Sequence, residues 1–364
     1  MSKNEQNYVK EAFDSNWIAP AGPHIKLFED RLSEISDNLN IAVLSSGTAA
    51  IHLALILIGV ERDDFVICSS FTFSASVNPV IYQGAHPVFI DSEKDTWNMD
   101  PVLLDEAIVK KLSQNQKPKA IILVHLYGYP AKLDEILRIA NKYDIPIIED
   151  AAEAIGSFYN NKPLGTFGDI GIYSFNGNKI ITTSSGGAIL SKDNNIIKKA
   201  KFLATQARED YPHYEHSEIG YNYRMSNVCA AIGVGQLEVL KDRVQKRRYI
   251  HDYYKQNLSS IKEINFLEEL PGFYSNRWLT TIVLSEKSVI KREDIRLNLL
   301  KENIESRPLW KPMHLQPVFR KYENFDNRVS EDLFNRGLCL PSGSNMKIED
   351  LDRVINNIKS LYDN

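Results

Sequence analysis

The segment at residues 174–190, SFNGNKIITTSSGGAIL, places one lysine between two apolar runs. The first run breaks into small, turn-forming residues around Lys179, and the second resumes after Gly186 and Gly187. A solvated surface lysine needs no such setting, whereas a loop lysine between buried strands can serve as an amine nucleophile that forms a Schiff base. Together with Gly177, the two glycines would let the backbone turn tightly around a bound group.

A second motif, SSGTAAIHLAL at residues 45–55, joins an apolar run to a helical pattern through Ser46, Gly47 and Thr48. The first N–H groups of a helix have no acceptor within the helix, so such a terminus suits a phosphate dianion. Ser or Thr at this position could equally act only as a helix N-cap. The sequence lacks the GxxxxGK[ST] pattern, so this is not a Walker loop.

A third motif, IPIIEDAAEAIGS at residues 145–157, places Asp150 at the end of a short apolar strand. A buried carboxylate without a partner is costly, and a protonated ring nitrogen would compensate it. Such a pair attracts by roughly 4 kcal/mol at about 4 Å with an effective dielectric near 20. Asp150 could instead cap a helix.

Taken together, these motifs supply what pyridoxal 5'-phosphate requires: a phosphate anchor, a carboxylate for the ring nitrogen and a Schiff-base amine. Each motif alone also fits a cap or a turn. Their combination predicts a site for this cofactor, in the form of either pyridoxal or pyridoxamine phosphate.

Short apolar runs that alternate with amphipathic segments must position these residues. Seven runs are predicted as buried strands, at residues 41–46, 65–70, 86–91, 120–128, 145–150, 169–175 and 186–192. Helical patterns at residues 48–58, 74–83 and 131–143 lie between them. Strands that are apolar throughout and alternate with helices predict a mostly parallel sheet covered on both faces, and ligands of such sheets bind at the carboxyl ends of the strands.

The pattern changes after residue 240. The charged segment 241–256 predicts a long helix, looser strands follow near residues 278–284, and residues 351–362 predict a closing helix. We therefore expect a large α/β domain over residues 1–240 and a smaller α+β domain over residues 241–364. With 364 residues, 43% of them hydrophobic, the chain is long enough for two such domains.

Charge and hydropathy exclude several classes of partner. The net charge of -4 and the absence of long runs of one sign argue against nucleic acid and anionic membranes. The longest apolar run, residues 51–60, is about half of the ~20 residues that a membrane span needs. These features predict a cytoplasmic protein with a small-molecule substrate.

The cysteines and histidines are predicted to be structural. The three cysteines lie far apart in apolar surroundings, which fits core residues rather than a disulfide framework; they are Cys68, Cys229 and Cys339. Three histidines lie within apolar patterns and are also predicted to be core residues; they are His52, His86 and His125. No metal-ligand spacing is present, so no metal is predicted.

The motifs also occur together in a known order. The segments SSGTAAIHLAL, FTFSASVNPV, HPVFIDSEKDTWNMD, EDAAEAIGS and YSFNGNKIITTSSGGAIL resemble those of the DegT/DnrJ/StrS sugar aminotransferases, in the same order and spacing. The likeness runs from NWIAPAGPHIKLFEDRL near the start to SRPLWKPMHLQPVF and RGLCLPSGSN near the end. It implies the aspartate-aminotransferase-like fold, fold type I, with a large domain of mixed, mostly parallel sheet and a smaller α+β domain.

The resemblance implies roles for individual residues. Lys179 would form the Schiff base, Asp150 would meet the ring nitrogen and Phe71 would cover a ring face. The full set of implied cofactor-binding residues is Gly47, Thr48, Ala49, Phe71, Asp150, Glu153, Ser174 and Lys179, with Asn222 from a partner subunit. The implied substrate-binding residues are Trp17, Arg224, Arg307, Trp310 and His314.

One position departs from the commonest family pattern. Many members have glutamine where Glu153 stands, and an ionised glutamate cannot donate a hydrogen bond to the ring oxygen. Either Glu153 is protonated or the ring hydroxyl donates to it. The same glutamate is typical of members that aminate UDP-linked 4-keto-6-deoxy sugars, and the segment SRPLWKPMHLQP resembles that subgroup.

The loop YNYRMSN at residues 221–227 reaches the active site of the neighbouring subunit in this family, so the resemblance implies a homodimer with shared sites. The aromatic and histidine-rich loop at residues 211–216 is either a surface segment or a flap over the sugar. Assembly beyond the dimer is left open.

The resemblance implies transfer of an amino group from L-glutamate to the C4 keto group of a nucleotide-linked 4-keto-6-deoxy sugar. The expected substrate is UDP-2-acetamido-2,6-dideoxy-hexos-4-ulose, in the synthesis of bacillosamine-type sugars for lipopolysaccharide and other surface glycans. The alternatives are C3 or C4 amination of a dTDP- or GDP-linked keto sugar, and a non-catalytic sensor or scaffold. Relatives that dehydrate sugars carry histidine in place of Lys179. The amino donor and the stereochemistry of the new amine stay open.

Overall fold

The centre of the computed structural model, which describes residues 1–363, is an eight-stranded sheet in the order β1-β9-β8-β5-β4-β2-β3-β14. The strands from β8 to β14 in this order run parallel, and β9 is antiparallel to β8 and β1. Their bounds are β1 (Asn40–Leu44), β2 (Phe65–Ser69), β3 (His86–Ile90), β4 (Ala120–Val124), β5 (Ile147–Asp150), β8 (Ile170–Ser174), β9 (Gly187–Ser191) and β14 (Asn324–Phe325). The seven strands predicted from the sequence are all present, and β14 is an addition from the C-terminal part of the chain.

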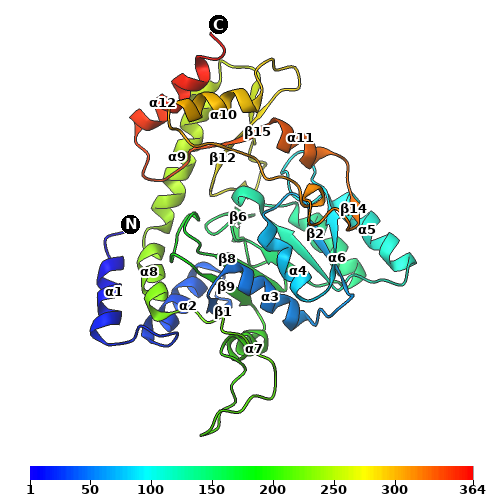
Figure 1. The fold of residues 1–364 in the computed structure, drawn as a ribbon, viewed down its shortest axis with the longest axis vertical. Helices are drawn as coiled ribbons and strands as arrows, with labels where there is room; N and C mark the ends of the chain where they lie inside the picture. The colour runs from blue at the N-terminus through cyan, green and yellow to red at the C-terminus, as the bar shows by residue number, and fades with distance from the viewer. Residues whose placement is uncertain (364) are drawn as a thin grey trace.

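Both faces of this sheet are covered by helices, as the apolar strands predict (Figure 1). Alternate residues of one strand enter separate hydrophobic clusters: Ile121 of β4 lies in one and Ile122 in the other. The first cluster includes residues of α2 (Pro23–Ile35), α5 (Pro101–Ser113), α6 (Leu133–Tyr143) and α8 (Asn227–Leu237). The second includes residues of α3 (Gly47–Ile58), α4 (Asn78–Tyr82) and α7 (Asn194–Ala204).

Helix α3 accounts for the longest apolar run of the sequence. Its residues from Ala49 to Leu55 are buried against the sheet, so the run is apolar because the helix is enclosed. Among residues 1–363, no helix is both long enough and apolar enough to cross a membrane. The helix predicted at residues 74–83 is shorter than expected: it divides into a 3-10 turn, η1 (Ser74–Ser76), and α4, which has Pro79 in its first turn.

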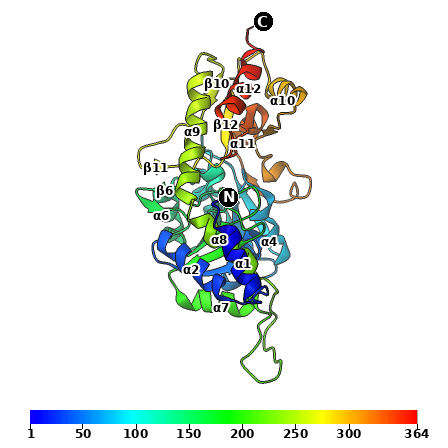
Figure 2. The same ribbon diagram turned by 90° about the vertical axis from the view of Figure 1, so that its left-hand side faces the viewer.

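A second, antiparallel sheet has the order β10-β12-β15-β13. Its strands are β10 (Ile264–Phe266), β12 (Thr280–Leu284), β13 (Arg307–Pro308) and β15 (Gly337–Leu340). It packs with α9 (Leu240–Leu258), α10 (Arg292–Lys301) and α12 (Ile348–Lys359) around a hydrophobic core of its own. Figures 1 and 2 show α8 and α9 as successive parts of one column that runs from the large sheet to this smaller layer. The α/β class with a smaller α+β part is confirmed.

Later segments of the chain return to the large part of the molecule. Strand β14 pairs with β3, and β11 (Phe273–Tyr274) extends a small sheet with β6 (Phe158–Tyr159) and β7 (Lys162–Pro163). Helix α11 (Val329–Arg336) follows β14, while α1 (Glu5–Asp14) packs on α8. The division at residues 240 and 241 stays a prediction, since α9 begins at Leu240 but these pairings cross it.

All three cysteines are free, with Cys68 and Cys339 buried and Cys229 half-buried against the core. His52 is buried and hydrogen-bonded to Tyr223 and Gln83. His86 contradicts the prediction of a core residue.

The side chain of His86 is 43% exposed, and its Nε2 lies 3.4 Å from Asp63 Oδ1. It opens β3 at the end of the strand, where one side chain can still reach solvent. Among residues 1–363, no group of three or more His, Cys, Asp or Glu side chains could hold a metal ion.

Candidate active site

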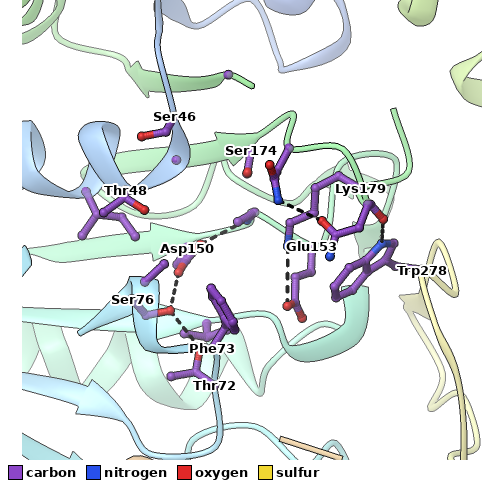
Figure 3. A pocket seen from close by; sticks show the side chains of 18 of the residues that line it. Ser46, Thr48, Thr72, Phe73, Ser76, Asp150, Glu153, Ser174, Lys179 and Trp278 are labelled. Carbon is purple, nitrogen blue, oxygen red and sulfur yellow. Dashed lines mark hydrogen bonds and ion pairs between the residues drawn. The ribbon is translucent and has the colours of Figure 1, made fainter. Parts of the chain in front are cut away.

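A cavity of about 260 Å³ lies at the carboxyl ends of the parallel strands (Figure 3). Asp150 ends β5, Ser174 ends β8, and Gly47 begins α3 directly after β1. Other lining residues come from the loop between β8 and β9 and from much later segments, among them Lys179, Trp278 and Trp310. The three sequence motifs around Lys179, Asp150 and Gly47 therefore meet in one place.

Asp150 points into this cavity and is only 4% exposed. Its Oδ2 accepts a 2.7 Å hydrogen bond from Ser76 Oγ, and its Oδ1 accepts one of 3.1 Å from the N–H of Ala152. Ser76 Oγ also lies 2.8 Å from Thr72 Oγ1. No Lys, Arg or His among residues 1–363 lies within ion-pair distance of Asp150, so a buried anion is left without a cation of the chain.

Glu149 precedes Asp150 and points to the opposite face of the sheet, because side chains alternate along a strand. It is fully buried and accepts hydrogen bonds from His125 Nε2 and from the N–H groups of Gly165, Phe167 and Gly168. His125 Nδ1 accepts from the N–H of Ala131, so Nε2 carries the proton and donates. Burial alone would raise the pKa of Glu149, but the bond from His125 and the backbone donors outweigh it and lower the pKa.

The start of α3 forms one wall of the cavity. Ser46 Oγ caps the helix by accepting from the N–H of Ala49, at 3.0 Å. The N–H groups of Gly47 and Thr48 have no acceptor within the helix, and both residues line the cavity beside the hydroxyl of Ser174. The N–H of Ala49 is bonded to this cap, and the predicted contact of Ala49 with the cofactor stays a prediction.

Two glycines allow the elements of this wall to come close together. A Cβ at Gly47 would lie 3.0 Å from the Cβ of Ser174, and a Cβ at Gly187 would lie 2.4 Å from the carbonyl carbon of Ser46. Gly187 is therefore required by strand packing. A Cβ at Gly177 would make only an ordinary contact, at 3.9 Å, so the predicted need for glycine there is not supported.

Lys179 lies on the loop between β8 and β9, where its N–H donates to the carbonyl of Asn176. Its Nζ is 3.6 Å from Glu153 Oε1 and 4.1 Å from the ring centroid of Trp278. The indole Nε1 of Trp278 donates to the carbonyl of Asn178, at 2.9 Å. This bond ties the loop to a tryptophan that precedes β12, and the ring attracts the ammonium group of Lys179.

Glu153 is buried beside Lys179, and its Oε2 accepts from the N–H of Tyr127 at 2.6 Å. Burial raises the pKa of Glu153, and the charge of Asp150 acts in the same direction. Lys179 and the N–H of Tyr127 oppose this shift without cancelling it. The carboxyl therefore holds its proton more tightly than an ordinary glutamate.

The aromatic residue that the FTFSAS motif presents to the cavity is Phe73, rather than the predicted Phe71. Phe71 is 2% exposed and belongs to the hydrophobic core. In an extended strand Phe71 and Phe73 would share a face, but the chain bends at residues 70–72, so the two side chains part. Phe73 has its ring centroid 5.6 Å from that of Trp310, and the two side chains form an aromatic edge of the cavity.

Several predicted residues lie outside the cavity of their own chain. Trp17 and Asn222 are exposed, and Arg224 borders a separate cavity with Lys201. His314 Nδ1 lies 2.6 Å from Ser70 Oγ, and Arg307 borders a second, adjoining cavity.

The loop at residues 211–216 belongs to the segment between α7 and α8, which projects away from the large sheet (Figures 1 and 2). It is exposed along its length.

Sequence reasoning missed several residues of the cavity. Ser76, Thr72 and Phe73 belong to a motif that was recognised, but only the geometry shows which side chains of it reach Asp150 or the cavity. Trp278 has no local signal at all, since it meets Lys179 from a segment almost 100 residues further along the chain.

The residues present fit pyridoxal phosphate. The free N–H groups at the start of α3 and the nearby hydroxyls suit its phosphate, and the unpaired carboxylate of Asp150 suits a protonated ring nitrogen. Lys179 Nζ is a primary amine held within the same cavity. All three requirements are met by side chains or N–H groups that face one space.

Comparison with known proteins gives the same picture over the whole chain. EpsN of Bacillus subtilis, whose name describes it as a candidate pyridoxal phosphate-dependent aminotransferase, is 52% identical over 100% of this chain and 94% of its own length. A GDP-perosamine synthase of Escherichia coli O157:H7 is 37% identical over 100% of this chain and 96% of its own. A UDP-4-amino-4,6-dideoxy-N-acetyl-beta-L-altrosamine transaminase of Campylobacter jejuni is 30% identical over 95% and 92%.

Solved structures of similar fold include aminotransferases with and without cofactor. A DegT DnrJ EryC1 StrS aminotransferase from Brucella abortus has a TM-score of 0.92, with 28% identity over 99% of this chain and 95% of its own. Spr1654 from Streptococcus pneumoniae, whose name describes it as a candidate sugar aminotransferase, has a TM-score of 0.90 in its pyridoxal phosphate form. It is 28% identical over 99% of this chain and 96% of its own. The model of the DegT/DnrJ/EryC1/StrS aminotransferase family matches residues 1–359, so the chain belongs to this family and is a pyridoxal phosphate-dependent aminotransferase.

Proposed function

We propose that the protein transfers an amino group from L-glutamate to the C4 keto group of a nucleotide-linked 4-keto-6-deoxy sugar. The observation that carries this proposal is the single cavity that holds Lys179, Asp150 and the start of α3. We name UDP-2-acetamido-2,6-dideoxy-hexos-4-ulose as the substrate, in the synthesis of surface-glycan sugars of the bacillosamine type. Its support is Glu153, together with a relative named as a transaminase of a UDP-linked amino sugar.

A GDP-linked keto sugar is the second candidate, because relatives named as GDP-perosamine synthases are 37%, 34% and 36% identical to this chain. Amination at C3 and dTDP-linked sugars are further alternatives. A sensor or scaffold without catalysis would have no need to keep a primary amine and an unpaired carboxylate in one cavity.

The cofactor, when bound, supplies an electron sink for the negative charge that forms at the reacting carbon. Lys179 Nζ would hold the cofactor. As a free amine, the same Nζ would take the proton from the α-carbon of glutamate and later give a proton to C4 of the sugar. One amine can do both, because the amino donor and the sugar occupy the same cavity in turn.

Asp150 holds the positive charge of the ring nitrogen, and Ser76 and the N–H of Ala152 orient its carboxylate. The N–H groups of Gly47 and Thr48 would bind the phosphate, with the hydroxyl of Ser174 beside them. Phe73, which lines the cavity, would cover a face of the ring in place of Phe71.

We further propose that the active enzyme is a homodimer with shared sites. Asn222 and Arg224 are exposed and lie outside the cavity of their own chain, as do Trp17 and the loop at residues 211–216. A partner subunit that brings Asn222 to the cofactor and Arg224 to the substrate would use all of these groups. A symmetric dimer would complete two such sites at once.

The spectrum of the purified protein tests the proposed function. The protein with pyridoxal phosphate is expected to show an absorbance band near the visible edge, because Lys179 binds the cofactor covalently. The band should bleach with L-glutamate and recover with the UDP-linked keto sugar, and Lys179→Ala should show no such band. A band that ignores both the UDP- and the GDP-linked keto sugar would contradict the proposed reaction, and recovery with the GDP sugar alone would move the substrate to the second candidate.

Replacing the carboxylate tests the role of Asp150. Asp150→Asn keeps the size of the side chain but removes the charge that holds the ring nitrogen protonated, which is worth about 4 kcal/mol and hence roughly a thousandfold in turnover. The far-UV circular dichroism should not change. Ser76→Ala is the matched control, because it removes one hydrogen bond to the carboxylate and should slow turnover by at most about tenfold. Near-normal turnover of Asp150→Asn would refute the role.

The raised pKa of Glu153 makes stability depend on pH. Since the folded state binds this proton more tightly, the wild-type protein without cofactor should lose stability as pH rises from the ordinary glutamate pKa to the raised value. Glu153→Gln lacks this titration, so its free energy of unfolding relative to wild type should grow as pH rises above about 4, the ordinary glutamate pKa, measured by urea unfolding. Glu106→Gln on α5 is the control, because it makes the same substitution at an exposed position away from the cavity. A difference for Glu153→Gln that shrinks with pH would be the opposite result.

Mixing two inactive variants tests the shared sites. Lys179→Ala and Arg224→Ala, reassorted in equal amounts, should regain about a quarter of wild-type activity, because half of the dimers are mixed and each has one intact site of two. Lys179→Ala mixed with Asp150→Asn is the control and should regain none, since both residues belong to the same chain's half of the site. No recovery in the first mixture would show that Arg224 does not act across the subunit boundary.

A further inference from the structure

A second cavity, of about 550 Å³, adjoins the one that holds Lys179. The two share Asn178, Trp278 and Trp310, so they form neighbouring parts of one hollow. The walls of the second cavity come from the smaller sheet and its helices, including Arg247 of α9 and the segment at residues 303–307.

Arg247 is a buried cation in the wall of this second cavity, and only 9% of its surface is exposed. One terminal nitrogen donates to the carbonyl of Trp278 at 2.7 Å, while its Nε has no hydrogen-bond partner among the described residues. Burial, with the nearby charge of Arg243, lowers its pKa to about 10. A buried guanidinium that meets only a neutral carbonyl is costly unless an anion joins it.

Two other residues that line the same cavity carry a buried donor without a partner among residues 1–363. The donors are Ser306 Oγ and the indole Nε1 of Trp310. Unpartnered buried donors are rare in folded proteins. Three of them around one cavity, one of which is a guanidinium, are the donor set that an oxyanion requires.

The acidic groups at the rim of this cavity are already engaged. Glu305 pairs with Arg307, and Asp350 accepts from the N–H of Lys347 at the start of α12. Among residues 1–363, no carboxylate lies within ion-pair distance of Arg247. The negative charge that compensates the guanidinium of Arg247 must therefore come from a bound molecule.

We propose that Arg247, with Ser306 and Trp310, binds an oxyanion of a substrate during the amino transfer. This inference rests on the proposed function. Arg247 reaches the backbone of Trp278, whose ring lies over Lys179 Nζ at 4.1 Å, so the anion site is one residue away from the reacting amine. Both a carboxylate of the amino donor and the diphosphate of the nucleotide sugar have the required chemistry.

Calorimetric titration of the holoenzyme distinguishes these two sources. Glutarate is the carboxylate probe, since it lacks the amine that would react, and UDP is the diphosphate probe. The affinity for one of them should fall by about 10- to 100-fold in Arg247→Met, the loss expected for a charged hydrogen bond. Loss of glutarate binding assigns the site to the donor, and loss of UDP binding assigns it to the sugar nucleotide.

Trp310→Phe is the second variant: it removes the indole N–H but keeps an aromatic side chain, and it should weaken binding of the same probe. The exposed neighbour Lys246→Met is the control and should bind both probes as wild type does. Unchanged affinity for both probes in both variants would overturn the proposal, as would a wild-type protein that binds neither probe.

The absorbance of the lysine-bound cofactor separates binding from mere positioning of Trp278. A changed resting spectrum in Arg247→Met with both affinities intact would mean that Arg247 only positions Trp278, and the proposal would be wrong. The titration needs no turnover. A protein that binds a probe through Arg247 but does not transaminate would therefore refute the proposed function and leave the anion site standing.

Discussion

The active site depends on the way β5 ends in two consecutive buried carboxylates. Side chains alternate across a sheet, so Glu149 and Asp150 must point to opposite faces. On one face, four hydrogen-bond donors fix the position of the Glu149 carboxylate. On the other, Asp150 meets only a hydroxyl and an N–H group. Glu149 fixes the end of the strand, and Asp150 is thereby held in a cavity where no cation among residues 1–363 lies within ion-pair distance of it.

The other walls of the cavity also combine groups that are bonded within the protein with groups that are left free to bind a ligand. Ser46 satisfies one donor of α3 and leaves those of Gly47 and Thr48 facing the cavity. The close packing of Gly47 on Ser174 and of Gly187 on Ser46 brings three strand ends to one edge of the sheet. A residue with a side chain at either glycine would keep these segments further apart. The geometry of this wall of the cavity is thus set by strand packing.

The sequence predicts this arrangement as far as local patterns reach. The seven strands, the start of α3 and the meeting of Lys179 with Asp150 follow from apolar runs and from polar residues at their ends. The choice between Phe71 and Phe73 does not, since it depends on how the chain bends at residues 70–72 after β2. Nor does the exposure of His86, which lies at the first residue of its strand. Trp278 and Arg247 escape local reasoning entirely, because both act through contacts between segments that are distant along the chain.

Trp278 explains why the smaller sheet is part of the active site. Its ring lies against Lys179 Nζ, and its indole N–H donates a hydrogen bond to the carbonyl of Asn178. Its own carbonyl accepts a hydrogen bond from Arg247 of α9. A single residue therefore ties the lysine loop of the large sheet to the helix that leads into the smaller one. Any shift of the smaller sheet would move Trp278 relative to Lys179 and change the wall that both cavities share. Residues 1–240 contain Lys179, Asp150 and the start of α3, but Trp278 and Trp310, which line the same cavity, come from later in the chain. Chemistry that must exclude water needs the enclosure that these later residues complete.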